Sequence, residues 1–150
     1  ANCLVGSEMC IRDSYCIFSN NSTLAGHVTV GDHVTLAGMV AVHQFCKIGR
    51  HSFIAGGSLV RKDIPPYVKA AREPLSFVGI NSVGLRRRGF DTNTIKSIQN
   101  IYRILFQKKH NNTQAISIIE AELEATKERD EILSFIQNSQ RGIMKGYFQN

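Results

Sequence analysis

The chain repeats itself every six residues in LAGHVTVGDHVTLAGMVAVHQFCKIGRHSF, residues 24–53. With FSNNST before it and IAGGSL after it, this stretch makes seven consecutive blocks. Every block opens with a large apolar residue: Phe18, Leu24, Val30, Leu36, Val42, Ile48 and Ile54. The fifth residue of every block is small or β-branched: Ser22, Val28, Val34, Val40, Cys46, Ser52 and Ser58.

A period of six fits neither the two-residue period of an ordinary strand nor the 3.6-residue period of a helix. It is typical of a hexapeptide β-helix, in which each block forms one flat side of a coil. The opening residue points into a narrow core, and the fifth must be small to fit beside it. Three blocks close one coil in the left-handed members of this class, so residues 18 apart stack about 4.8 Å from each other. We therefore predict a left-handed parallel β-helix, with residues 18–60 forming slightly more than two coils and all seven opening residues buried.

The N-terminal stretch does not keep this period. One block before Phe18, the inward place falls on Arg12, which a narrow apolar core does not accommodate. Removing residues 7–13 restores the period. The segment SEMCIRDS resembles a translated sequencing-adaptor read-through, and a loop inserted at a coil corner is the alternative interpretation. On either interpretation we expect residues 7–13 to lie outside the coil.

Composition and charge limit the classes of function. The 150 residues suit one domain with an appendage, and no apolar run approaches the length of about 18 residues that a membrane-spanning helix needs. The net charge of +6 is concentrated in residues 60–90, which carry seven basic and two acidic side chains. An acidic protein or a phosphorylated small molecule should bind there. No nucleic-acid motif accompanies the charge, so no nucleic-acid partner is expected. The four cysteines have neither zinc-site nor disulfide spacing, which favours reduced thiols and a cytoplasmic location.

The second half of the chain differs in character. Pro65 and Pro66 cannot continue a strand ladder and should turn the chain away from the coil. We therefore divide the chain into a β-helix over 1–64, with 7–13 inserted or foreign, an irregular basic connection over 65–90 and a C-terminal helical domain over 91–150.

Three helices are expected in that C-terminal domain, where they would seal the end of the rod. Their periodic segments are residues 91–107, 113–128 and 130–140. Asp91 is the expected N-cap of the first helix and Thr113 that of the second.

Four of the five histidines lie within the repeat. His33 and His51 are 18 apart in the same place of the block, so their side chains should stack. A third metal ligand is not evident beside them, and surface histidines without a metal are the expected outcome. His27 and His43 occupy one side of adjacent coils. With residues 7–13 removed, Ala1 joins the same column.

Four motifs, in this order and spacing, closely resemble the acyl-ACP–UDP-N-acetylglucosamine O-acyltransferase family: NNSTLAGHV (20–28), MVAVHQFCKIG (39–49), DIPPYV (63–68) and GLRRRGF (84–90). The resemblance extends from residue 14 to about 145. It implies a left-handed β-helix with a C-terminal helical domain, assembled as a homotrimer with active sites between subunits. It also implies transfer of a 3-hydroxyacyl chain from acyl carrier protein to the 3-hydroxyl of UDP-N-acetylglucosamine, the first step of lipid A synthesis. Both are substrates, so no cofactor is expected.

The same resemblance suggests roles for individual residues of the repeat. Gly26 matches the residue whose backbone N–H meets the developing oxyanion. His27 and His43 match histidines of the active site that contact substrate, and Gln44 matches another active-site contact. Gly56 matches the position that limits the length of the acyl chain.

Asn81, Arg87 and Arg88 match contacts to the nucleotide and to the phosphopantetheine of the carrier. The catalytic histidine of the family, a general base, lies in an A-H-x-x-H-D-C segment. Asn2 and Cys3 align with the end of that segment, which places Ala1 where the histidine belongs. We expect truncation or corruption of the N-terminus, and a chain that is inactive as written.

Two other functions are compatible with the repeat. One is another hexapeptide-repeat acyl- or acetyltransferase that acts on a sugar nucleotide with acyl-CoA, although DIPPYV and GLRRRGF argue against it. The other is a non-catalytic trimeric β-helix scaffold. A scaffold would not bind UDP-N-acetylglucosamine, so a thermal-shift assay with that nucleotide separates it from the transferase.

Overall fold

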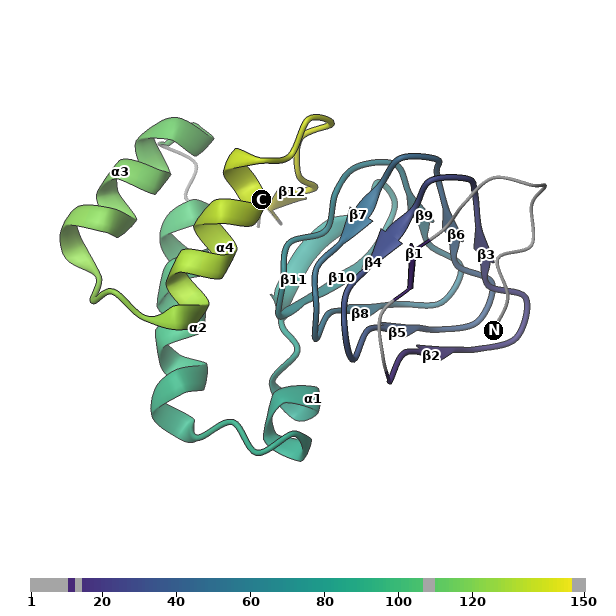
Figure 1. Ribbon diagram of the computed structural model, residues 1–150, viewed down its shortest axis with the longest axis horizontal. Coiled ribbons are helices and arrows are strands. Elements are labelled where there is room, and N and C mark those ends of the chain that lie inside the picture. Colours follow the sequence, from purple (N-terminus) through teal and green to yellow (C-terminus); the bar gives the residue numbers. More distant parts are fainter. Residues whose placement is uncertain (1–10, 13–14, 107–109, 147–150) are drawn as a thin grey trace.

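A computed structural model describes residues 11–12, 15–106 and 110–146 (Figure 1). The first half is a β-solenoid of about three turns, and the helices lie beside one end of it (Figure 1). Each side of a turn is a strand of two residues: β1 (Ile11–Arg12), β2 (Ile17–Phe18), β3 (Thr23–Leu24), β4 (Thr29–Val30), β5 (Thr35–Leu36), β6 (Ala41–Val42), β7 (Lys47–Ile48), β8 (Phe53–Ile54) and β9 (Leu59–Val60).

Equivalent strands of successive turns pair in parallel and form three sheets. Their orders are β1-β4-β7, β3-β6-β9 and β12-β11-β10-β8-β5-β2, and the last sheet includes three strands from later in the chain, β10 (Val68–Ala71), β11 (Ser76–Ile80) and β12 (Lys145–Gly146). Among β1 to β9 the register joins residues 18 apart, as in Thr23 with Ala41 and Thr35 with Phe53. The predicted coil of three six-residue blocks is therefore confirmed.

The opening residues of the blocks make the core of the solenoid. Six of the seven are at most 3% exposed, and the fifth residues of all seven blocks are buried. Phe18 is only half-buried, because β2 is the last strand of its sheet among the described residues. Cys46 is one of the buried fifth residues, and burial raises the pKa of its thiol to about 11. A thiol of this kind stays protonated and unreactive, as expected of a core residue.

The corners of the solenoid place side chains in stacks. The fourth residue of each block from Asn21 to His51 has φ between 57° and 65°, a conformation that Asn and His adopt more readily than most residues. The rings of Tyr15, His33 and His51 stack at one corner with successive centroids 4.9 Å apart. Tyr67 extends the stack at 5.8 Å from His51. The predicted stacking of His33 on His51 is thus confirmed, within a longer aromatic ladder, but the expectation of surface histidines is wrong for His51, which is buried.

The expectation that residues 7–13 leave the coil is wrong for Ile11 and Arg12, the two of them that the structure describes. These residues form β1 and pair with Thr29 and Val30, again 18 positions apart. Tyr15 also has the positive φ of a corner residue. Backbone N–H and C=O groups make the strand ladder whatever the side chain, so an arginine in the sequence does not by itself end the pairing.

The segment expected to be an irregular basic connection contains regular structure. The prediction that Pro65 and Pro66 turn the chain away from the coil is wrong, because β10 (Val68–Ala71) still pairs in parallel with β8 on the solenoid, with Lys69 opposite Phe53. β11 (Ser76–Ile80) returns antiparallel to β10, and the short helix α1 (Ser82–Arg87) follows. The last turn of a solenoid has unpaired backbone groups at its edge, and β10 and β11 cover that edge.

Three further helices follow: α2 (Thr92–Leu105), α3 (Asn112–Glu122) and α4 (Lys127–Gln137). Asp91 caps α2 as predicted, since its carboxylate accepts the Thr94 N–H at 2.7 Å. The predicted cap at Thr113 is wrong. Asn111 caps α3 instead, because it forms a reciprocal pair with Gln114 at 2.8 and 3.1 Å.

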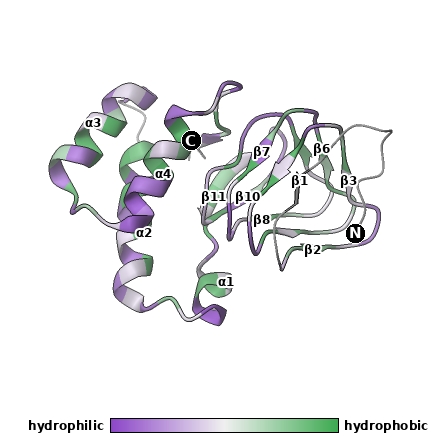
Figure 2. Cartoon of the chain, in the orientation of Figure 1, coloured by the Kyte–Doolittle hydropathy of each residue, from purple (hydrophilic) through white to green (hydrophobic). Residues whose placement is uncertain are grey.

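The helices do not form a separate three-helix domain. After α4 the chain returns to the solenoid, and β12 (Lys145–Gly146) pairs with β11. Figure 2 shows hydrophilic and hydrophobic residues mixed along α2, α3 and α4, which is typical of helices with one face against a core. None of the helices in the described ranges is long and apolar enough to cross a membrane.

Buried polar contacts fix the helices to the solenoid. The Tyr102 hydroxyl on α2 donates to the Pro66 carbonyl at 2.5 Å. Arg50, at a solenoid corner, forms an ion pair of 2.7 Å with Glu131 on α4. Asp63 is buried and accepts hydrogen bonds from the Lys47 N–H at 2.9 Å and the Ser139 hydroxyl at 2.6 Å. The solenoid end and the helices therefore behave as one packed unit.

The aromatic ladder should make stability depend on pH. His51 is 6% exposed. Burial, followed by the charges of Arg50, His33 and Arg88, lowers its pKa from 6.5 to about 4. Between these two values the unfolded chain binds a proton that the folded chain does not. As pH falls from 6.5 to 4, the free energy of unfolding should therefore drop by roughly 3 kcal/mol from this group.

His51→Asn should remove this part of the pH dependence, because Asn tolerates the positive φ at this position and does not titrate. Urea unfolding of both proteins from pH 4 to 8 measures the difference. Between pH 7 and 8 the two stability profiles should run parallel. Profiles that stay parallel down to pH 4 would contradict the assignment.

Candidate functional site

Four of the predicted site residues meet at one corner of the solenoid. Gly26 and His27 follow β3, and His43 and Gln44 follow β6 one turn later. The two turns are joined there, since the Gly26 carbonyl accepts the Phe45 N–H at 3.2 Å. We call these four residues and Phe45 the β3–β6 corner. The prediction that His27 and His43 lie on one side of adjacent coils is confirmed, whereas Ala1, the third member of the predicted column, lies outside the described residues.

Most side chains of this corner are exposed to solvent. His27, His43 and Gln44 are exposed, whereas Gly26 is buried between them and the core. Nδ1 of His43 lies 3.2 Å from the Gln44 carbonyl oxygen. Two imidazoles and an amide on one corner can donate to and accept from hydroxyl and phosphate oxygens.

Phe45 is a member of this corner that the sequence analysis missed. Its ring stacks on the His27 imidazole with centroids 4.9 Å apart and an interplanar angle of 1°. Phe45 is also 54% exposed, which is unusual for a large aromatic side chain. The sequence could have indicated this contact, because Phe45 follows His27 by 18 residues, which is one turn of the solenoid. Phe45 orients the His27 ring and adds an apolar contact surface beside it.

Gly56 lies at a different corner, in the turn between β8 and β9. The sheet β3-β6-β9 separates it from the β3–β6 corner. It is exposed, and a β-carbon at this position would lie 3.2 Å from the Gly38 carbonyl oxygen, which is a tight contact. A ligand that passes this corner therefore meets bare backbone.

The remaining predicted residues belong to α1 and its ends. Arg87 and Arg88 are exposed at the C-terminal end of this helix. Asn81 is its N-cap, and the amide makes two hydrogen bonds within the protein. Nδ2 donates to the His51 carbonyl at 2.9 Å, and Oδ1 accepts the Gly84 N–H at 3.3 Å. Asn81 thus ties α1 to the corner that carries the aromatic ladder.

A cavity of about 430 Å³ lies between α1 and the outer face of sheet β8-β5-β2. Its lining is partly apolar and partly cationic, and comprises Ile17, Thr35, Phe53, Lys69, Ile80, Asn81, Ser82, Val83, Gly84 and Arg87. The Lys69 ammonium lies 5.6 Å from the centroid of the Phe53 ring. A ligand with an anionic group and a flat apolar group would complement such a cavity.

Within one chain, the residues of the β3–β6 corner and the residues of α1 do not lie together. α1 lies along the outer face of the β2-β5-β8 strands, whereas the β3–β6 corner joins the other two sheets (Figure 1). Ala1 lies outside the described residues. Within the described part of the chain there is no group of three or more His, Cys, Asp or Glu side chains that could hold a metal ion.

The chain matches one family model, described as UDP N-acetylglucosamine O-acyltransferase, domain 2, over residues 63–144. The acyl-[acyl-carrier-protein]–UDP-N-acetylglucosamine O-acyltransferase of Stenotrophomonas maltophilia is 40% identical over 143 residues, covering 91% of this chain and 52% of that protein. The protein of the same name from Aliivibrio salmonicida is 40% identical over 144 residues, covering 96% and 52%. The chain thus spans about half the length of these relatives.

Solved structures agree with these matches. A UDP-N-acetylglucosamine acyltransferase from Bacteroides fragilis is 44% identical, with a TM-score of 0.85 over 87% of this chain and 51% of that one. The enzyme of the same description from Francisella novicida is 38% identical, with a TM-score of 0.85 over 91% and 50%. The similarity therefore includes the fold as well as the sequence.

The role of Asn81 can be tested through its neighbour Gly84. A β-carbon at position 84 would lie 2.4 Å from Nδ2 of Asn81, so Gly84→Ala should displace the amide from both hydrogen bonds. We expect Gly84→Ala and Asn81→Ala each to reduce the free energy of unfolding by about 1–2 kcal/mol. The double variant should cost clearly less than the sum, because Asn81→Ala removes the side chain that position 84 would strike.

Urea unfolding of the four proteins measures this coupling, and amide hydrogen exchange in α1 reports whether the helix has loosened. Val83→Ala is the matched control, because this side chain of α1 is 57% exposed and should change stability by less than about 0.5 kcal/mol. Strictly additive effects would show that a β-carbon at position 84 does not act through the Asn81 amide, and unchanged stability of Asn81→Ala would show that Asn81 does not anchor α1.

Proposed function

This chain belongs to the UDP-N-acetylglucosamine O-acyltransferase family, and on that premise we propose that it serves the first step of lipid A synthesis. In this step a 3-hydroxyacyl chain passes from acyl carrier protein to the 3-hydroxyl of UDP-N-acetylglucosamine. The observation that supports this function best is the β3–β6 corner, where two exposed histidines flank a buried glycine on adjacent turns.

The proposed chemistry is an acyl transfer from a thioester. The sugar 3-hydroxyl oxygen attacks the thioester carbonyl carbon, and a general base takes the hydroxyl proton. The backbone N–H of Gly26 then stabilises the oxyanion, a role that needs close approach and no side chain. The oxyanion collapses, the carbon–sulfur bond breaks, and the protonated base returns its proton to the departing sulfur, so the carrier leaves as the free thiol. His27, His43 and Gln44 hold the sugar and acyl groups in place.

The rest of the machinery follows from the same proposal. Arg87 and Arg88 provide cations for phosphate groups, and Asn81 holds the helix that carries them. The exposed backbone at Gly56 lets a long acyl chain pass that corner. The reaction as proposed requires no cofactor and no metal, because the acyl group is already activated as a thioester.

The separation of the two groups on one chain supports a site formed between copies. The β3–β6 corner of one copy would face α1 of the next, and a homotrimer would build three such sites. We also propose that the solenoid is left-handed and ends in a helical region, and that the enzyme is cytoplasmic. The general base would come from the position of Ala1, where this chain has only a methyl group.

Activity measurements test the proposal directly. We expect no turnover by this chain or by its Ala1→His variant, because both span only about half of the relatives' length. A fusion of the upstream half of the Stenotrophomonas maltophilia relative to residues 15–150 should transfer acyl groups to UDP-N-acetylglucosamine. In that fusion His27→Ala and His43→Ala should each lower kcat/KM by roughly 10- to 100-fold, as expected for a lost hydrogen bond to a reacting substrate.

The control is His110→Ala in the same fusion, because this residue precedes α3 and lies apart from the β3–β6 corner. It should keep full activity. Full activity of the His27→Ala and His43→Ala variants would contradict the proposed site. Turnover by the chain as it stands would overturn the assignment of the base.

A further inference from the structure

The helix that carries two arginines of the proposed site, α1, is only six residues long. A helix of this length has little stability in isolation, so its position depends on contacts with the rest of the protein. Both ends of α1 make such contacts, and both lead to the same residue of the solenoid, His51.

The N-terminal end of α1 is bound to the backbone of two solenoid corners. The Asn81 side chain caps the helix and donates from Nδ2 to the His51 carbonyl at 2.9 Å. The backbone N–H of Asn81 donates to the Tyr67 carbonyl at 2.8 Å. The first residue of the helix therefore cannot shift along the solenoid without breaking two hydrogen bonds.

The C-terminal end of α1 is closed by a Schellman motif. Gly89 has φ of 86°, and its N–H donates to the Arg86 carbonyl at 3.1 Å. The Phe90 N–H donates to the Leu85 carbonyl, also at 3.1 Å, and the Leu85 side chain is fully buried. The motif fixes the direction in which the chain leaves the helix, and this direction places the Phe90 ring against the solenoid.

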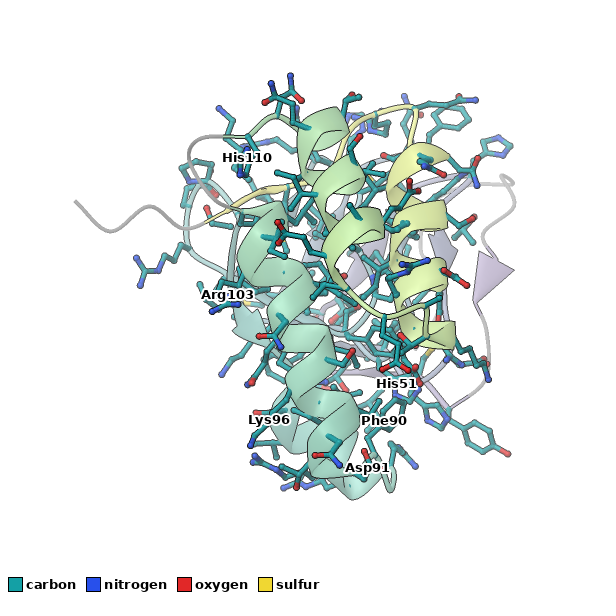
Figure 3. All side chains as sticks on the ribbon, turned by 90° about the vertical axis from the view of Figure 1, so that its left-hand side faces the viewer. His51, Phe90, Asp91, Lys96, Arg103 and His110 are labelled. Carbon is teal, nitrogen blue, oxygen red and sulfur yellow. The ribbon has the colours of Figure 1, made fainter. Side chains whose placement is uncertain are left out.

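The Phe90 ring contacts the aromatic ladder at His51. Its edge packs against the His51 imidazole with centroids 5.0 Å apart and an interplanar angle of 72°, a favourable arrangement for two aromatic rings. Figure 3 shows the two side chains close together near the start of α2. The imidazole is itself held between His33 at 4.9 Å and Tyr67 at 5.8 Å. His51 is therefore a fixed support for the C-terminal end of α1.

We propose that His51 is a positioning residue of the reaction, because its carbonyl and its ring hold the two ends of α1 and thereby set where Arg87 and Arg88 lie. The inference rests on the proposed function, since His51 acts through the phosphate-binding arginines of that reaction. His51 is only 6% exposed and belongs to the ladder, so this role requires no contact with substrate.

The imidazole serves this role by its shape and not by its charge. Burial, with smaller contributions from the charges of Arg50, His33 and Arg88, lowers the pKa of His51 to about 4. The ring is therefore neutral near pH 7 and does not repel the arginines of α1. An aromatic ring that does not titrate should hold the helix as well.

Steady-state kinetics of the active fusion, in which residues 15–150 follow the upstream half of the Stenotrophomonas maltophilia relative, test the proposal. His51→Asn should raise KM for UDP-N-acetylglucosamine about 3- to 10-fold and leave kcat within about twofold, because hydrogen bonds to phosphate depend on the direction of the arginines. His51→Phe should restore KM to within about twofold. Phe45 has φ of 65° in the same place of its block, so a phenyl side chain is compatible with this backbone.

The matched control is His33→Asn. His33 has nearly the same φ as His51, 57° against 59°, and belongs to the same ladder on the side of His51 away from Tyr67. Its substitution should lower stability, as that of His51 does, but leave KM within about twofold. An equal rise of KM in His33→Asn and His51→Asn would show a general loosening of the solenoid and overturn the proposal.

Two further variants test whether His51 acts through the arginines. In an Arg87→Ala/Arg88→Ala background, His51→Asn should change KM by less than about twofold, since the groups that it positions are absent. A full effect in that background would overturn the proposal. Phe90→Leu removes the other ring of the contact and should raise KM as His51→Asn does, which keeps the test decisive if circular dichroism shows that His51→Asn does not fold.

Hydrogen exchange separates this inference from the function on which it rests. In the 150-residue chain itself, His51→Asn should accelerate amide exchange in α1, and His33→Asn should not. Unchanged exchange in α1 would overturn the positioning role whatever the activity. An unchanged KM of His51→Asn in an active fusion would overturn this inference alone, whereas an unchanged fusion without turnover would overturn the proposed function and the role of His51 in it.

Discussion

The narrow core of the solenoid is the constraint on which the rest of this structure depends. Each flat side admits one large apolar side chain and one small neighbour, so the chain must deliver them every six residues. Because three sides close a turn, the same constraint places corner residues 18 positions apart directly above one another. The His27–Phe45 pair and the ladder from Tyr15 to Tyr67 both result from this repeat, although neither contributes an opening residue to the core.

The end of the solenoid decides where the second half of the chain lies. Its last turn would leave backbone groups and the apolar core uncovered, and β10, β11 and the helices cover them. The covering segments are connected to the corners through polar contacts, among them Asn81 to the His51 carbonyl and Arg50 to Glu131. A helix as short as α1 has little stability of its own, so the Asn81 contact determines where its arginines lie.

The shape of the solenoid also explains why the candidate site residues lie on two separate faces, the β3–β6 corner and the side that carries α1. A rigid three-sided rod cannot fold its own corners toward one another, so residues on different corners of one chain stay apart. Such a rod can build a cleft only against a second surface. Met39 and Leu59 are exposed on the corner and the sheet that separate the two groups, and Phe45 is exposed in the β3–β6 corner itself. This geometry makes association of copies a natural way to complete a site.

The sequence by itself determined the solenoid, its buried residues and the stacking of His33 on His51. It could do so because the six-residue period is a local property that every block repeats. It also determined that His27 and His43 share a corner and that Asp91 caps α2. Only the tertiary structure decided that Ile11 and Arg12 join the coil, that β10 and β11 follow Pro66, and that the Asn81 amide is engaged within the protein. These features depend on hydrogen bonds to backbone groups of segments that are distant in the chain. Such pairing produces no repeating pattern of side chains, so the sequence alone does not predict it.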